Sequence, residues 1–106
     1  MAEPYQKVNV QQAKDMLAKD GVQLIDVRTP AEYKNGHLPR AKSIPLDTIL
    51  ARPRDVLSGD NIIFVCQVGQ RSAIAAEMAA AVGIKNLYNL EGGTDAWIKS
   101  GNAVER

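Results

Sequence analysis

The sequence contains few of the residues that build metal centres and disulfides, with one cysteine and one histidine among its 106 residues. A single cysteine excludes an internal disulfide. One cysteine and one histidine also make too small a ligand set for a structural zinc site. We therefore expect a domain that works without a metal and without a cofactor.

An excess of charge and long apolar runs are lacking as well. The 13 Lys and Arg residues nearly balance the 12 Asp and Glu residues, to a formal net charge of +1, whereas nucleic-acid binders usually carry a marked basic excess. No apolar run approaches the roughly 18 residues that a membrane span needs, and residues 1–7 lack the apolar segment of a secretory signal. We expect no nucleic-acid partner, no membrane contact and a cytoplasmic location, and nothing demands more than a monomer.

The composition that remains is typical of one globular domain covering residues 1–106, with 45% hydrophobic and 24% charged residues. Apolar patterns predict strands at 8–10, 23–27, 43–45, 62–65 and 86–90, and helices at 11–19, 46–52, 72–82 and 94–99. Turns are expected at Pro53, 58–61 and 91–93. This alternation favours an α/β fold with a mainly parallel central sheet.

Two segments carry more specific signals. Thr29 to Glu32 predicts a helix start, in which Thr29 caps, Pro30 takes the first position and Glu32 reaches back to the cap. Asn35-Gly36 would end this short helix. Residues 62–65, Ile-Ile-Phe-Val, are all apolar, which indicates a strand covered on both faces.

The lone cysteine, Cys66, directly follows that buried strand, at the position where α/β proteins bind ligands. The loop after it leads into a helix and consists of Gln67, Val68, Gly69, Gln70, Arg71 and Ser72. Backbone N–H groups of the turn, the positive end of the helix and the Arg71 cation would all favour a thiolate, and Gly69 suits a tight loop. A buried, unreactive cysteine is the competing interpretation, and the convergence of these features favours the reactive one.

Further short segments accompany this loop along the chain. The set is Leu24–Arg28, Glu32-Tyr33, Gly36–Pro39, Ile44-Pro45, Cys66–Ser72 and Leu90–Trp97. Together these segments resemble a single-domain rhodanese over residues 8–100, which implies a central parallel sheet flanked by helices on both faces and a sulfurtransferase activity. One departure is Arg40 before Ala41, where the family commonly has glycine. We expect it to alter the local backbone and to leave activity intact.

The resemblance implies a mechanism with two half-reactions. Cys66 takes a sulfane sulfur from a small anion such as thiosulfate, becomes a persulfide and passes the sulfur on. The N–H groups from Gln67 to Ser72 would stabilise the outer sulfur, and Arg71 would bind the anionic donor or hold the loop. Because the chain has no second cysteine, the acceptor must come from outside, as cyanide, a thiol or a protein thiol.

Two other functions stay open. A phosphatase or arsenate reductase also uses a Cys–Arg loop, but the phosphatase signature has five residues between the two and usually a histidine before the cysteine. Here four residues separate Cys66 from Arg71, and Val65 precedes the cysteine, so the ring is better sized for one sulfur than for a phosphate. The second is a sulfur-carrier or regulatory module that acts with a protein partner.

Other polar and aromatic residues are interpreted as structural. Asp26 and Arg28 end a predicted strand on the side of the site and would border the pocket, but we favour a structural role. In this structural role, Asp26 accepts hydrogen bonds from loop N–H groups, and Arg28 pairs with Glu32 or another acid. His37 is expected to stabilise a turn, and Trp97 to fill the core of a small domain.

A loose basic stretch consists of Arg40, Lys42, Arg52 and Arg54. These cations would form a solvated surface, because acidic residues interrupt them. The alternative is that they steer thiosulfate or dock an acidic partner.

Overall fold

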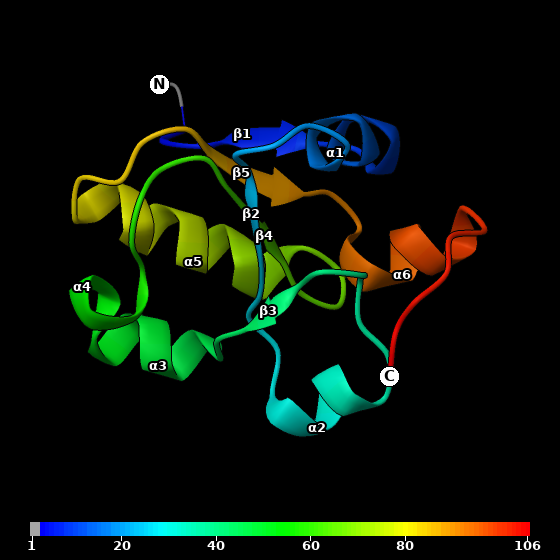
Figure 1. Cartoon of the computed structure of the whole chain (residues 1–106). Helices are drawn as coiled ribbons and strands as arrows, with labels where there is room; N and C mark the ends of the chain where they lie inside the picture. Colours follow the sequence, from blue (N-terminus) through cyan, green and yellow to red (C-terminus); the bar gives the residue numbers. More distant parts are fainter. Residues whose placement is uncertain (1–2) are drawn as a thin grey trace.

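The computed structural model describes residues 3–106, and within them five parallel strands form one sheet in the order β1-β5-β4-β2-β3 (Figure 1). The strands are β1 Gln6–Val8, β2 Gln23–Asp26, β3 Lys42–Ser43, β4 Ile62–Val65 and β5 Leu87–Leu90. The helices are α1 Val10–Leu17, α2 Pro30–Lys34, α3 Leu46–Ala51, α4 Pro53–Val56, α5 Gln70–Ala81 and α6 Gly93–Lys99. The predicted α/β class with a parallel sheet is confirmed.

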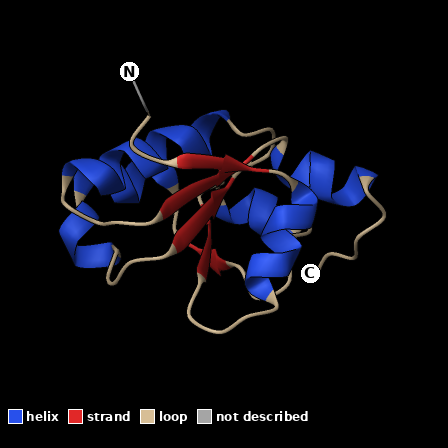
Figure 2. Cartoon of the chain, turned by 90° about the horizontal axis from the view of Figure 1, so that it is seen from above, coloured by secondary structure: helices blue, strands red, loops and turns tan. Residues whose placement is uncertain are grey.

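Helices cover both faces of the sheet (Figure 2). On one face α3, α4 and α5 pack over a cluster that includes Ile25, Ile62 and Phe64. On the other face α1 and α6 cover a second cluster, which includes Ile63 and Trp97. The four residues of β4 are all buried, as their unbroken apolar run predicts, because successive side chains of a strand point to opposite faces.

Several element boundaries differ from the sequence-based prediction for local reasons. The strand expected at 8–10 ends at Val8, because Asn9 caps α1 through a capping box with Gln12. Pro53, expected in a turn, opens the short helix α4, since proline suits the first position of a helix. Helix α2 has the predicted Thr29 cap with Glu32 reaching back.

The strand order makes the carboxyl ends of β2 and β4 the topological switch point of the sheet. The connection after β2 leads outward to β3, whereas the connection after β4 leads to β5 on the other side. Ligands of parallel sheets bind at such a switch point. Cys66 follows β4 there, and Asp26 ends β2 beside it, paired in register with Val65.

Candidate active site

Cys66 lies at the bottom of the loop that joins β4 to α5, with 1% of its surface exposed. The loop is short because α5 begins at Gln70, two residues before its predicted start. Gly69 turns the chain into the helix with a φ of 108°, a left-handed conformation that favours glycine. Arg71 and Ser72 therefore belong to the first turn of α5, at its positive end.

Hydrogen-bond donors surround the sulfur. The Gly69 N–H lies 3.1 Å from Sγ, and the Ser72 hydroxyl lies 3.3 Å from it. Burial raises the pKa of the Cys66 thiol, but the Ser72 hydroxyl and the backbone N–H groups of Ser72, Gly69 and Val68 outweigh burial, so the pKa lies below its ordinary value. The geometry favours a thiolate, as the loop sequence predicts.

Arg71 is engaged by a carboxylate from another helix. Its guanidinium donates to both oxygens of Glu32 on α2, at 2.8 and 2.9 Å. These hydrogen bonds lower the pKa of Glu32 to about 2, against the opposing effect of burial, and they raise the pKa of Arg71. Arg71 still contributes positive charge near Cys66, and it holds the start of α5 against α2.

Asp26 and Arg28 form a buried ion pair at the end of β2, with 2.7 Å between Arg28 Nη2 and Asp26 Oδ2. Arg28 therefore pairs with Asp26, whereas Glu32, named among its expected partners, binds Arg71. Asp26 also accepts the backbone N–H of Arg28. The remaining Arg28 nitrogen donates to Gln67 Oε1 at 3.0 Å, so the pair holds the first residue of the cysteine loop.

The start of α6 fixes the loop from the other side. The Thr94 N–H and hydroxyl donate to the Cys66 carbonyl at 2.8 and 3.0 Å, and the Asp95 N–H donates to the Gln67 carbonyl at 3.1 Å. The Asp95 carboxylate also accepts from the Gln67 side chain. These contacts are possible because Gly93 has no side chain to occupy the narrow space beside these carbonyls.

The comparisons with known proteins agree with this geometry. The rhodanese-like domain family model matches residues 9–100. The chain belongs to the rhodanese-like domain family. It is 33% identical to thiosulfate sulfurtransferase 18 of Arabidopsis thaliana, over 92% of this chain and 81% of that protein. The crystal structure of a rhodanese-related protein from Thermoplasma volcanium superposes with a TM-score of 0.83 at 28% identity, covering 95% of this chain and 98% of that one.

Some relatives are longer than this rhodanese-like domain. The chain is 37% identical to the uncharacterized protein YqhL of Bacillus subtilis over 71% of its own length, but spans 60% of that protein. It spans 46% of an uncharacterized Synechocystis relative. The likeness therefore concerns the domain and its sulfurtransferase family.

His37 and Trp97 are structural in the rhodanese-like domain. The His37 ring stacks on that of Tyr33 with 3.7 Å between centroids, and its Nδ1 lies 2.9 Å from the Tyr33 carbonyl oxygen. Trp97 is buried in the core cluster under α6, and its indole N–H donates to the Ala103 carbonyl. Both roles agree with the structural interpretation of the sequence.

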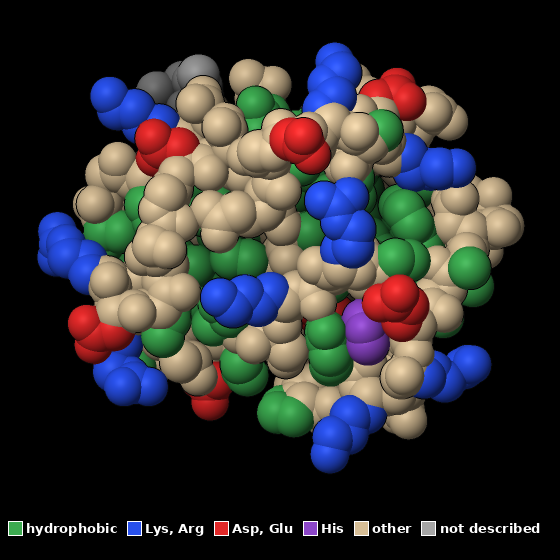
Figure 3. Space-filling model, viewed as in Figure 1, with side chains coloured by type: hydrophobic (Ala, Val, Ile, Leu, Met, Phe, Trp, Pro, Cys, Tyr) green, Lys and Arg blue, Asp and Glu red, His purple; other side chains and the backbone are tan. Residues whose placement is uncertain are grey.

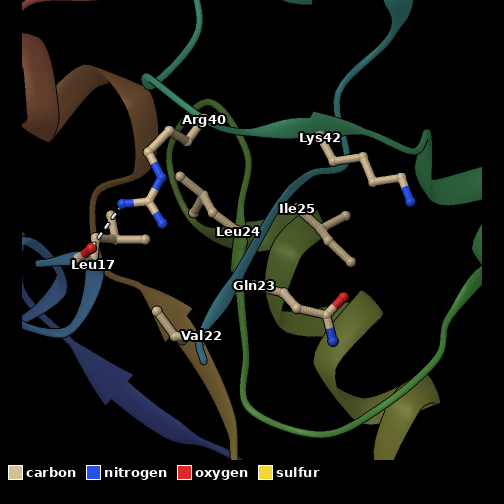
Figure 4. Close-up of a pocket in the computed structure, with 7 residues that line it drawn as sticks. All are labelled: Leu17, Val22, Gln23, Leu24, Ile25, Arg40 and Lys42. Carbon is tan, nitrogen blue, oxygen red and sulfur yellow. Dashed lines mark hydrogen bonds between the residues drawn. The ribbon is translucent and has the colours of Figure 1, made fainter. Parts of the chain in front are cut away.

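The four residues of the basic stretch lie in two separate regions of the molecule. Arg40 donates to the Leu17 carbonyl at the end of α1, and with Lys42 it lines a cavity of about 200 Å³ beside β2 (Figure 4). Figure 4 shows the Lys42 side chain extending away from Arg40. Arg52 and Arg54 lie on the return from α3 towards the amino end of β4. The backbone of Arg40 has a φ of 70°, in the left-handed region that suits glycine.

The contacts that three residues make in the site were not predicted from the sequence. Glu32 has a clear role as a capping residue, which concealed its pairing with Arg71. Thr94 depends on a close approach of α6 that only the tertiary structure reveals. Asn89 is a buried polar residue within the otherwise hydrophobic strand β5, and that mismatch is the one sequence feature that could have indicated it. No cluster of three or more metal-ligating side chains occurs within residues 3–106.

No helix of residues 3–106 combines the length and apolar character that a membrane crossing requires. On the face seen in Figure 3, basic and acidic side chains alternate without forming a large patch of one sign. The His side chain on this face lies beside an acidic one, and Nε2 of His37 is 3.8 Å from Glu105 Oε1.

Proposed function

We propose that this rhodanese-like domain is an enzyme that transfers a sulfane sulfur from thiosulfate, or a donor like it, to an external thiophile through a persulfide on Cys66. The observation that carries the proposal is the donor set around Sγ: the Gly69 N–H at 3.1 Å, the Ser72 hydroxyl at 3.3 Å, and a lowered thiol pKa. A thiolate is the form of cysteine that attacks sulfur.

In the first half-reaction the Cys66 thiolate attacks the outer sulfur of thiosulfate. A new S–S bond forms, the bond between the two sulfurs of thiosulfate breaks, and sulfite leaves with the electron pair. The negative charge then rests on the outer sulfur of the persulfide. Loop N–H groups already fixed by α5 and α6 stabilise this charge without reorganising.

In the second half-reaction an external nucleophile attacks the outer sulfur. Cyanide gives thiocyanate and returns the electron pair to Sγ as the thiolate. A thiol or a protein thiol would accept the sulfur in the same way. The acceptor is external because the sequence holds no second cysteine to resolve the persulfide as an internal disulfide. We place this chemistry in the cytoplasm, where thiols stay reduced.

Intact-mass spectrometry after incubation with thiosulfate tests the proposal. The wild type should gain one sulfur, and cyanide should remove it. Cys66→Ser should gain nothing. The matched control is Cys66→Ser combined with Ser100→Cys, which restores one thiol at an exposed position outside the loop, and it should also gain nothing.

A phosphatase remains the alternative that this experiment must exclude. Hydrolysis of an aryl phosphate by the wild type, without any persulfide after thiosulfate, would contradict the proposal. A persulfide that forms with thiosulfate but passes only to a protein thiol and not to cyanide would favour a sulfur-carrier role.

A further inference from the structure

The buried side-chain amide of Asn89 contacts both residues that donate hydrogen bonds to the Cys66 sulfur, Gly69 and Ser72. Asn89 lies on β5, next to β4, with 5% of its surface exposed. Its Oδ1 accepts the hydroxyl of Ser72 at 2.5 Å, and its Nδ2 donates to the carbonyl of Gly69 at 3.0 Å. The carbonyl can only accept, so it fixes the orientation of the amide and directs Oδ1 at Ser72.

The Ser72 hydroxyl therefore faces two acceptors with one hydrogen. Its oxygen lies 2.5 Å from Asn89 Oδ1 and 3.3 Å from Cys66 Sγ. When Cys66 is a thiol, S–H donates to Ser72 and Ser72 donates to Asn89, so each group has a partner. When Cys66 is a thiolate, the single hydrogen must serve either the sulfur or the amide oxygen.

The other charged groups around Cys66 are each paired with a charged or polar partner. They come from every neighbouring element: Arg71 on α5 with Glu32 on α2, Asp26 with Arg28 at the end of β2, and Asp95 on α6 against Gln67. On the far side of Asn89, Lys7 and Glu91 line a cavity of about 210 Å³ together with Val68–Gln70. Asn89 is neutral, so the Ser72 hydroxyl can turn between Asn89 Oδ1 and Sγ without altering these charges.

We propose that Asn89 is a positioning residue whose Oδ1 competes with Cys66 Sγ for the hydrogen bond of the Ser72 hydroxyl, and that it accepts this hydrogen bond again when the persulfide forms. This inference rests on the proposed function. In the thiolate the hydroxyl turns to Sγ. In the persulfide the charge sits on the outer sulfur, Sγ no longer attracts the hydrogen, and the hydroxyl turns back to Asn89. The hydroxyl rotates in each step, and no proton is gained or lost.

The test measures the thiolate of Cys66 directly, from its ultraviolet absorbance against pH, with Cys66→Ser as the blank. Asn89→Leu keeps the branched shape and the number of heavy atoms and removes the competing acceptor, so the hydroxyl stays on the sulfur. We expect roughly three to ten times more thiolate at pH values below the midpoint. If the substitution instead loosened the Gly69 loop, the amount of thiolate would decrease, because the sulfur would lose the Gly69 N–H as a donor.

Ser72 provides the decisive background. If Asn89 acts through the hydroxyl, Asn89→Leu should have no effect on the titration of Ser72→Ala. Tyr88→Phe is the matched control, since it removes a polar group from the neighbouring position on β5 whose side chain packs on the opposite face of the sheet, and it should titrate like the wild type. Asn89→Val is the second variant should Asn89→Leu not fold, because β-branched residues suit strands.

A decrease in thiolate, no change, or an equal effect in the Ser72→Ala background would overturn the inference. The titration uses no sulfur donor, so it gives an answer even when thiosulfate forms no persulfide. Where a persulfide does form, its rate of formation in Asn89→Leu should exceed that of the wild type below the midpoint and converge with it at high pH.

Discussion

Gly93 determines how closely α6 approaches the cysteine loop. A Cβ at this position would lie 2.6 Å from the Gln67 carbonyl oxygen and closer still to that of Cys66, and the φ of Gly93 is 58°. Both neighbours are backbone atoms that cannot move aside without breaking the hydrogen bonds from Thr94 and Asp95. Gly93→Ala should therefore lower the free energy of unfolding by about 2–4 kcal/mol, measured by urea denaturation.

Gly83→Ala separates close approach from backbone strain. Gly83 has a φ of 93°, but a Cβ at this position would meet no atom within 4 Å, so its substitution should cost about 1 kcal/mol from conformation alone. Gly93→Ala should also slow persulfide formation, because it displaces the Cys66 carbonyl, while Gly83→Ala should not. Equal losses of stability in the two variants would contradict the role given to Gly93.

Single residues are predictable from the sequence where the chemistry is local. Cys66, Gly69 and the helix start after them are neighbours in the chain, and the structure places donors on the sulfur as expected. Asn89 and Glu32 reach the loop from other elements, and only strand pairing and helix packing bring them there. The structural interpretation of Arg28 holds, but its partner is the nearby Asp26.

At the scale of elements, the Glu32–Arg71 pair joins α2 to α5. The pKa of Glu32 falls from 4.5 to about 2 in the folded chain, so the pair adds stability that is complete above about pH 4.5 and is lost as the pH falls towards 2. The Glu32 side chain is 32% exposed, and solvent screening reduces the gain. Glu32→Gln, which keeps an acceptor for the Thr29 cap, should cost about 1–2 kcal/mol at pH 7.

Urea denaturation at several pH values checks this prediction. The difference between wild type and Glu32→Gln should shrink as the pH falls below 4.5, because Glu32 of the unfolded wild-type chain then takes up a proton that the folded chain binds only near pH 2. Glu77→Gln on the exposed side of α5 is the control, and it should change stability little at any pH. A difference that stays constant from pH 7 to pH 3 would show that the ion pair contributes nothing.

Element types follow from local patterns, while their limits follow from caps and packing. The apolar run of β4 and the Thr29-Pro30 start of α2 are confirmed. Helix α5 begins before its predicted start because Gly69 turns the chain directly into it. Its alanine-rich sequence has no strong apolar stripe, so periodicity alone could not fix its first residue.

At the scale of the whole molecule, the alternation of strands and helices predicts a parallel sheet, but the strand order requires the tertiary structure. The sequence does not say that β4 inserts between β5 and β2. That order places the switch point of the sheet beside Cys66, because the connections after β2 and β4 lead in opposite directions. It also decides which charges can act on the cysteine.

Arg52 and Arg54 lie at the edge of the sheet opposite to the one where Cys66 lies. Helix α3 starts at the carboxyl edge of the sheet, where the Leu46 N–H donates to the Val27 carbonyl. The chain then returns through Arg52 and Arg54 to the amino end of β4. Four residues of β4 separate the two edges, about 13 Å of strand. That distance exceeds the Debye length of roughly 10 Å at 0.1 M salt.

We therefore expect the salt dependence of persulfide formation to be independent of Arg52 and Arg54. Arg52→Gln with Arg54→Gln should leave the slope of log rate against ionic strength above about 0.1 M unchanged.

The matched comparison is Lys7→Gln with Arg106→Gln, which also removes two positive charges. Each of these cations lines a cavity that residues of the cysteine loop line as well. This variant should flatten the slope, because these cations lie within a Debye length of the loop and attract a dianionic donor. A flatter slope in the Arg52 and Arg54 variant, with no change in the Lys7 and Arg106 variant, would restore steering by these two arginines and move the entry route of the donor to the opposite edge of the sheet.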